Sequence, residues 1–287
     1  MRDFIIVTDS SADLTGEMSR ELGLRTIQLE VIVEGESAKT NDCIDPKDFY
    51  AQLRSKKGAT TSAVNIERFS NLFEEILTDD VDILYLGFSS GLSGTFNAGA
   101  VALGELAEKY PDRKLYAVDT LCASMGQGLL VWYAAQMKKK GADIDAVRKF
   151  VEDNRLKLCH WCTVDDLFFL KRGGRVSAAT AVLGTMLSIK PVMHVDNAGK
   201  LINVAKARGR RAAIEAMVEK MKATWIPEEN EAIFISHGDC IEDATYLADR
   251  VRAEFGVQNI EINYVGPVIG AHSGPGTLAL FFLGTER

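Results

Sequence analysis

Short apolar runs alternate with amphipathic stretches along the first half of the chain. Continuous apolar runs of this length are typical of strands covered on both faces, and a 3.6-residue apolar period indicates a helix. Strands are predicted at Phe4–Thr8, Arg25–Val33, Val81–Gly87 and Lys114–Asp119, and helices at Thr15–Leu22, from Pro46, and at Ile66–Leu77, Ala98–Tyr110, Met125–Lys140 and Asp143–Lys157. This alternation predicts a doubly wound, mostly parallel α/β sheet with a ligand crevice at the carboxyl ends of its strands.

After Lys157 the pattern changes to strands that form a hairpin and strands separated by longer helices. The predicted strands are Leu158–Val164, Lys190–Val195, Leu201–Ala205, Ala232–His237, Ile260–Val265 and Leu278–Leu283, and the predicted helices are Asp165–Leu170, Arg210–Thr224 and Ile241–Phe255. We therefore expect an α+β second half with a mixed sheet, and two domains comprising residues 1–157 and 158–287.

The turn between the strand ending at Gly87 and the following helix is rich in hydroxyls and glycines. Ser89, Ser90, Ser93 and Thr95 can donate hydroxyl protons, and glycines stand at 91 and 94. Free backbone N–H groups and the positive end of the helix dipole favour an anion at such a helix start. Serine, threonine and glycine are also ordinary capping residues, but one cap does not need four hydroxyls. The sequence therefore favours an anion-binding turn.

Composition limits the classes of function. The 287 residues are 47% hydrophobic and 25% charged, with a net charge of −7, which argues against broad nucleic-acid binding. We find neither a signal peptide nor an apolar run that would span a membrane, and the five cysteines are odd in number. These features predict a cytoplasmic protein with free thiols.

Two further groups of residues are candidates for function. His272 lies among Gly270, Gly274 and Gly276, where a constrained backbone would hold its ring toward a ligand. One guanidinium of the turn Lys171-Arg172-Gly173-Gly174-Arg175 could face the anion site.

Four cations, Lys206, Arg208, Arg210 and Arg211, gather near a predicted helix start and oppose the helix dipole. In an acidic protein, this arrangement suggests an acidic external partner, either membrane phosphates or another protein. A solvated basic surface is the alternative.

The sequence gives no sign of a metal or cofactor site. Cys159 and Cys162 are spaced as a C-x-x-C pair, but on a strand they would point to opposite faces. The phosphate-binding and dinucleotide-binding glycine patterns are missing, and so is the G-x-S-x-G elbow of hydrolases.

Ordered motifs along almost the whole chain resemble those of the DegV family, bacterial fatty-acid-binding proteins of the type that serve fatty acid kinase. The matching segments are Val7–Leu14, Thr60-Thr61-Ser62, Ser89–Asn97, Val118-Asp119-Thr120, Ser124-Met125-Gly126, Phe169–Arg175, Ile189-Lys190-Pro191 and Gly266–Leu280. One departure is Ala63-Val64-Asn65, where the family loop usually continues Gln-Pro-Ser.

The resemblance implies two α/β domains with one fatty acid between them. Matching the motifs implies that the carboxylate is bound by Thr61, Ser62, Ser93, Gly94 and His272, with Arg172 in the supporting network. The chain would be a carrier without enzyme activity, cofactor or metal, and would present the carboxylate to a separate fatty acid kinase. Arg208 and Arg210 would contact that kinase or an anionic membrane surface.

Predicted walls for the acyl tail are Ala178–Ile189 and Leu278–Leu283. Two alternatives remain open at this point. The first is an acyl-transfer or hydrolytic enzyme that uses Ser93 and His272. The second is a sensor or structural partner with a shorter ligand.

Overall fold

The first half of the chain builds a parallel sheet covered on both faces. The computed structural model describes residues 2–177 and 188–287. The sheet has the order β2-β1-β6-β7, and all its pairings are parallel. Its strands are β1 (Phe4–Asp9), β2 (Arg25–Ile27), β6 (Asp82–Gly87) and β7 (Leu115–Asp119).

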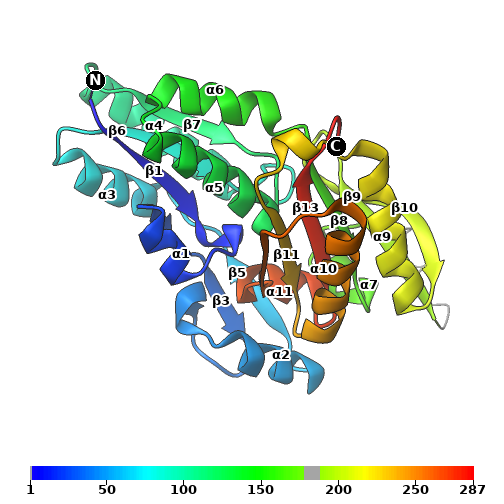
Figure 1. Cartoon of the computed structure of the whole chain (residues 1–287). Helices are drawn as coiled ribbons and strands as arrows, with labels where there is room; N and C mark the ends of the chain where they lie inside the picture. Colours follow the sequence, from blue (N-terminus) through cyan, green and yellow to red (C-terminus); the bar gives the residue numbers. More distant parts are fainter. Residues whose placement is uncertain (1, 178–187) are drawn as a thin grey trace.

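Five helices accompany this sheet: α1 (Gly16–Glu21), α3 (Ile66–Leu77), α4 (Thr95–Lys109), α5 (Met125–Lys139) and α6 (Ile144–Asn154). Alternate strand residues face opposite ways, so Leu84 and Leu86 pack with α5 and α6, whereas Ile83 and Tyr85 pack with α3 and α4. This arrangement confirms the predicted doubly wound architecture (Figure 1).

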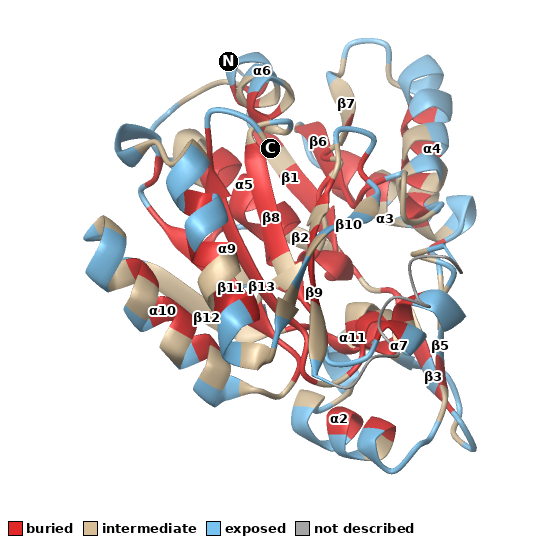
Figure 2. Cartoon of the chain, turned by 90° about the vertical axis from the view of Figure 1, so that its right-hand side faces the viewer, coloured by how far each residue is buried: buried red, intermediate tan, exposed pale blue. Residues whose placement is uncertain are grey.

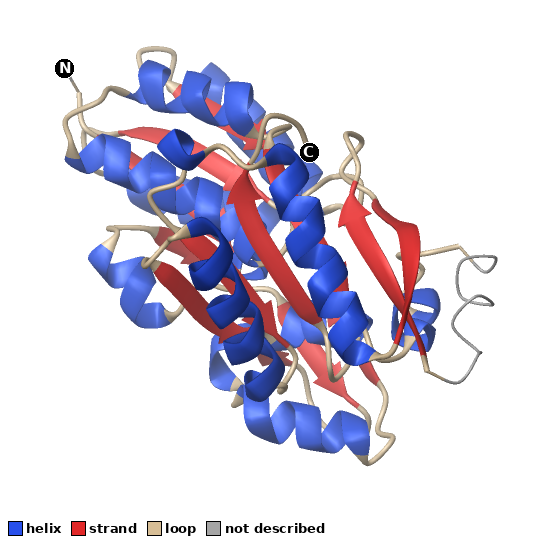
Figure 3. Ribbon diagram, turned by 45° about the vertical axis from the view of Figure 1, so that its right-hand side comes forward, coloured by secondary structure: helices blue, strands red, loops and turns tan. Residues whose placement is uncertain are grey.

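The second half forms a mixed six-stranded sheet with the order β10-β9-β8-β13-β11-β12. Its strands are β8 (Leu158–Thr163), β9 (Ile189–Val195), β10 (Leu201–Arg208), β11 (Ile233–His237), β12 (Ile260–Tyr264) and β13 (Leu278–Leu283). Among these described strands, β11 and β12 pair in parallel and the other pairings are antiparallel. The helices α9 (Arg210–Thr224) and α10 (Ile241–Phe255) cover one face (Figure 3), and β8, β11 and β13 are buried between layers (Figure 2). The predicted mixed sheet is confirmed.

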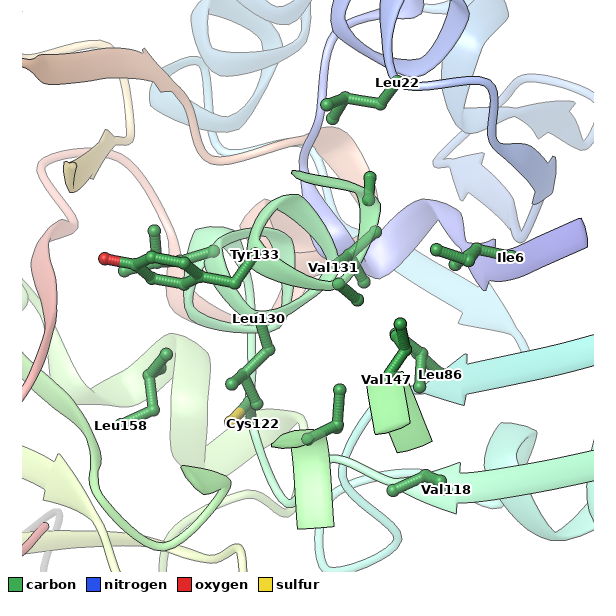
Figure 4. Packing of buried hydrophobic residues seen from close by; sticks show 14 of the residues in the cluster. Ile6, Leu22, Leu86, Val118, Cys122, Leu130, Val131, Tyr133, Val147 and Leu158 are labelled. Carbon is green, nitrogen blue, oxygen red and sulfur yellow. The ribbon is translucent and has the colours of Figure 1, made fainter. Parts of the chain in front are cut away.

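Helix α5 packs against both sheets. Its apolar side chains share one hydrophobic cluster with Ile6 and Leu86 of the first sheet and with Leu158 of the second (Figure 4). Phe281 of the second sheet belongs to the same cluster. The core is therefore continuous across residue 157, and the domain boundary placed there stays a prediction.

A third, small antiparallel sheet of order β4-β3-β5 was not predicted. It consists of β3 (Glu30–Val33), β4 (Lys39–Thr40) and β5 (Ala59–Ser62). The expected single strand Arg25–Val33 is wrong, because the chain leaves the parallel sheet after Ile27 and re-enters a different sheet at Glu30. The segment Thr60–Ser62, which the resemblance places in a loop, is likewise a strand paired with β3.

The remaining elements are α2 (Pro46–Arg54), α7 (Leu167–Arg172), α11 (Pro267–Ser273) and the 3-10 turns η1 (Ser10–Ala12), η2 (Asn41–Cys43) and η3 (Pro227–Glu229). The short helix α11 packs against α7, β5 and β3. It carries His272, which therefore lies in a helix from the second half that contacts strands from the first.

Within residues 2–177 and 188–287, every helix is too short or too polar to cross a bilayer.

Candidate functional site

A mainly apolar cavity of about 260 Å³ opens where the sheets meet. Its apolar walls are Leu29, Ala63, Phe88, Leu92, Ala123, Cys162, Val164, Leu170, Met193, Val195, Leu201, Val265, Val268, Ile269, Ala279 and Phe281. An apolar cavity of about 150 Å³ suffices to hold benzene. The volume and lining found here suit a hydrocarbon group.

Strand β13 is a wall of this cavity on one face only. Ala279 and Phe281 line the cavity, whereas Leu278, Leu280 and Phe282 pack with α9 and α10. Of the predicted wall Leu278–Leu283, the residues that line the cavity are thus Ala279 and Phe281, as the alternation of a strand requires. The other predicted wall, Ala178–Ile189, lies outside the described residues up to position 187.

Thr61 and His272 meet at the cavity wall. Thr61 Oγ1 lies 2.8 Å from His272 Nε2, and Arg175 Nη1 lies 3.5 Å from His272 Nδ1. A guanidinium can only donate, so Nδ1 is the acceptor and the ring proton is on Nε2, which donates to Thr61. The hydroxyl proton of Thr61 is then free to donate to a ligand.

Burial, with Arg175 and Arg172 nearby, lowers the pKa of His272 to about 4. The imidazole is therefore neutral at physiological pH. It acts as an orienting donor to Thr61 rather than as a second cation.

The turn after α7 sets the position of Arg175. The backbone of Gly173 packs directly on the imidazole, and a Cβ there would lie 2.4 Å from His272 Nδ1. Gly174 has φ +73°, a left-handed conformation that favours glycine. Arg175 also donates to the carbonyls of Leu92, at 3.3 Å, and Gly173.

Arg172, the residue predicted for the supporting network, is not part of the cavity lining. Its guanidinium lies over the Phe169 ring, 5.1 Å from the centroid. The guanidinium within hydrogen-bond distance of His272 belongs to Arg175, which follows Arg172 after the two glycines of the turn.

Ser93 and Gly94 line the cavity at the start of α4. Ser93 Oγ accepts from the Thr95 amide at 3.2 Å and lies 3.0 Å from Thr95 Oγ1. If Thr95 donates its hydroxyl proton to Ser93, the hydroxyl proton of Ser93 can point to a ligand.

Ser62 is not part of the lining, unlike Thr61 and Ala63. Neighbouring residues of a strand face opposite sides, so Ser62 and Thr61 cannot both face the cavity. The expectation that Ser62 joins the site does not fit this geometry.

Other residues of the hydroxyl-rich turn have structural roles. Ser89 Oγ donates to the Gly199 carbonyl at 2.7 Å. A Cβ at Gly91 would lie 2.5 Å from the Ala198 carbonyl oxygen, so glycine is required there by the β9–β10 hairpin rather than by a ligand. Asp9 accepts from the Phe88 amide at 2.9 Å and holds the start of the turn.

A second polar cluster lies on the cavity wall, and sequence reasoning missed it. Ser124 Oγ donates to Asp13 Oδ2 at 2.5 Å and lies 3.1 Å from Ser236 Oγ. Burial raises the pKa of Asp13 to about 7. Nothing local in the sequence links these residues, which are more than 100 positions apart.

His160 also lines the cavity, but both ring nitrogens are occupied. Nε2 accepts from the Ala123 amide at 3.1 Å, so Nδ1 carries the proton and donates to the Leu158 carbonyl at 3.0 Å. These contacts give His160 a structural role.

The cysteines of the C-x-x-C pair face opposite sides of β8. Cys159 packs with α9 and α10, and Cys162 lines the cavity. Burial raises the pKa of Cys159 to about 11 and that of Cys162 to about 12. Within the described ranges, we find no group of three histidine, cysteine or acidic side chains that could hold a metal ion.

The basic group near α9 divides into two parts. Arg210 Nε lies 2.8 Å from Asp243 Oδ2, and its side chain is only 17% exposed. Acidic groups on neighbouring elements thus compensate the charge of Arg210, and its contact with an external partner stays a prediction. Lys206 and Arg208 are exposed on one face of the edge strand β10, beside Ile202 and Val204.

Comparison with known proteins agrees with this fold. A family model described as an uncharacterised protein of the DegV family matches residues 3–285. A DegV domain-containing protein from Clostridium perfringens is 47% identical over all of this chain and 99% of its own length.

Two solved structures extend the comparison. One, described as showing fatty acid binding of a DegV family protein from Thermus thermophilus, has a TM-score of 0.87 and 31% identity, over 99% of this chain and 100% of its own. Another, DegV, a fatty acid binding protein from Bacillus subtilis, has a TM-score of 0.86 and 28% identity over the same shares. The chain described here belongs to the DegV family.

Proposed function

We propose that this chain binds a long-chain fatty acid in the cavity, with the carboxylate at Thr61, Ser93 and Gly94. The observation that carries the proposal is the hydrogen-bonded row Thr61–His272–Arg175 at the wall of an apolar cavity. The row leaves the Thr61 hydroxyl proton free, and hydroxyl and N–H donors can hold an anion. In this proposal Arg175 takes the supporting role that the family resemblance implies for Arg172.

Both parts of the chain contribute to this site. Residues 1–157 provide Thr61 and the turn at Ser93, while residues 158–287 provide His272, Arg175 and most of the apolar walls. Burying the tail stabilises the complex by about 0.8 kcal/mol per CH₂ group. The DegV proteins of Thermus thermophilus and Bacillus subtilis, described as fatty-acid-binding, support this ligand class.

The protein acts in this proposal as a cytoplasmic carrier rather than an enzyme. A hydrolase built on Ser93 and His272 would need a hydrogen bond between them. Instead, His272 is bonded to Thr61 and Ser93 to Thr95. The carrier presents the carboxylate to a separate fatty acid kinase, a role inferred from the family resemblance.

Mass spectrometry of the purified protein after denaturation tests the ligand class. We expect a long-chain fatty acid in near-stoichiometric amount, with no turnover when acyl esters are supplied. Recovery of a short polar ligand instead, or ester hydrolysis that Ser93→Ala abolishes, would contradict the proposal.

The exposed face of β10 is the proposed contact for the kinase or an anionic membrane. Arg208→Glu should impair coupling to a fatty acid kinase or to phosphatidylglycerol vesicles and leave the Kd for the fatty acid unchanged. Lys139→Glu, an equal charge change at an exposed position of α5, is the control. If Arg208→Glu couples as well as the control, β10 is a solvated surface only.

A further inference from the structure

The cavity contains polar groups that a hydrocarbon chain cannot satisfy. Ser124 is 5% exposed and Ser236 is fully buried, and both line the mainly apolar cavity. Ser273, 6% exposed, lines it as well, and its hydroxyl has no partner among the residues described. Buried hydroxyls without partners are costly, so such groups normally face a ligand or a bound water.

The hydrogen-bond directions leave Ser236 open toward the cavity. While Asp13 is ionised, Ser124 uses its only proton on Asp13, so Ser236 donates to Ser124. The lone pairs of Ser236 then have no donor among the hydrogen bonds of the described residues, and a hydroxyl on a ligand could supply one. When Asp13 carries a proton, the row can reverse, and Ser236 can then donate to a carbonyl oxygen.

The backbone holds this row in place. Ser124 has φ 52° and ψ −144°, a conformation that residues with a Cβ rarely adopt, and it comes immediately before α5. Asp13 also has a positive φ, of 53°. A strained backbone persists where the surrounding contacts fix it, and here it brings two buried polar side chains together.

His160, a neighbouring polar residue of the wall, cannot serve the same purpose. Its two ring nitrogens are occupied by backbone partners. Ser236 and Ser124, supported by Asp13, are therefore the groups of this cluster that can respond to a ligand.

We propose that this cavity prefers fatty acids that carry a hydroxyl or oxo group on the hydrocarbon chain, hydrogen-bonded by Ser236 and Ser124. The proposal rests on the proposed function and specifies its ligand class. A plain chain leaves the serine row facing CH₂ groups, whereas a hydroxylated chain satisfies it.

The test compares stearic acid with a series of hydroxystearic acids that differ in the position of the hydroxyl, by isothermal titration calorimetry on the full chain. We expect at least one positional isomer to bind about tenfold more tightly than stearic acid, the usual effect of one satisfied buried polar group. In Ser236→Ala and Ser124→Ala, the ratio of the two Kd values should fall to about one. In Cys162→Ala, which alters the wall without touching the row, the ratio should stay as in the wild type.

The comparison of stearic acid with the hydroxystearic acids uses the wild-type chain, so it does not depend on whether a variant folds. If stearic acid binds and no hydroxylated isomer binds more tightly, the preference is refuted while the proposed function stands. A preference that survives in both serine variants would also refute it. If none of the acids binds, the proposed function fails as well.

Discussion

The two polar clusters on the cavity wall differ in what they offer a ligand. Thr61 and His272, with Arg175 behind them, form a row that ends in a cation and presents hydroxyl protons. Ser236 and Ser124 form a row that ends in the carboxyl group of Asp13. An anion is stabilised by the first row and repelled by an ionised Asp13 in the second. The difference gives the ligand a direction in a cavity whose walls are mainly apolar.

The largest expected effect is the pH dependence of stability at Asp13. Burial raises the pKa of Asp13 from 3.8 to about 7, so the unfolded chain releases this proton first as the pH rises. The folded protein should lose about 3 kcal/mol between pH 5 and pH 8 relative to Asp13→Asn, which keeps an acceptor for Ser124. Urea denaturation of both proteins at the two pH values measures this, and parallel curves would contradict it.

The pH dependence of stability at His272 should have the opposite sign to that at Asp13. Its pKa is lowered from 6.5 to about 4, so its contribution is present above pH 6.5 and is lost as the pH falls toward 4. The wild type should lose about 2 kcal/mol from pH 8 to pH 5 relative to His272→Gln. The same denaturation series measures it. A loss in the other direction would mean that the imidazole is charged in the folded protein.

Removing the Thr61 hydroxyl directly tests the role of the row Thr61–His272–Arg175. Thr61→Val should weaken fatty acid binding by about 1.5 kcal/mol, roughly tenfold in Kd, because the buried carboxylate loses a donor. Ser62→Ala is the matched control, since its side chain is outside the cavity lining. Titration calorimetry compares them, and an equal loss in both variants would count against the assignment.

A smaller effect separates the two arginines of the α7 turn. Arg175→Gln should raise the Kd by about fivefold, or 1 kcal/mol, because Nδ1 of His272 loses its charged donor. Arg172→Gln should change the Kd by less than about twofold, since its guanidinium lies over Phe169. A larger rise in Kd for Arg172→Gln than for Arg175→Gln would instead assign the supporting role to Arg172.

Local patterns predicted most helices and strands well. The amphipathic period gave α3 (Ile66–Leu77), α9 (Arg210–Thr224) and α10 (Ile241–Phe255) with their observed bounds. An apolar run cannot reveal a change of sheet, so the separation of β2 from β3 was missed. Strand propensity does not indicate where tertiary pairing divides one apolar run between two sheets.

The candidate site was predictable only in part. Thr61 and His272 were both named, and they meet across 211 positions. The choice of Arg175 over Arg172 depends on which way the glycine turn reverses, and the exclusion of Ser62 depends on a strand that looked like a loop. The Asp13–Ser124 bond depends on two positive φ angles, and a serine gives no signal for the one at Ser124.

The central claim is that the row Thr61–His272–Arg175 holds the carboxylate. The row Ser236–Ser124–Asp13 does not. A crystal structure with stearic acid tests it most directly. The account predicts carboxylate oxygens within hydrogen-bond distance of Thr61 Oγ1 and Ser93 Oγ, with the tail passing Ser236. A carboxylate found at Ser124, or an acid bound outside this cavity, would contradict it.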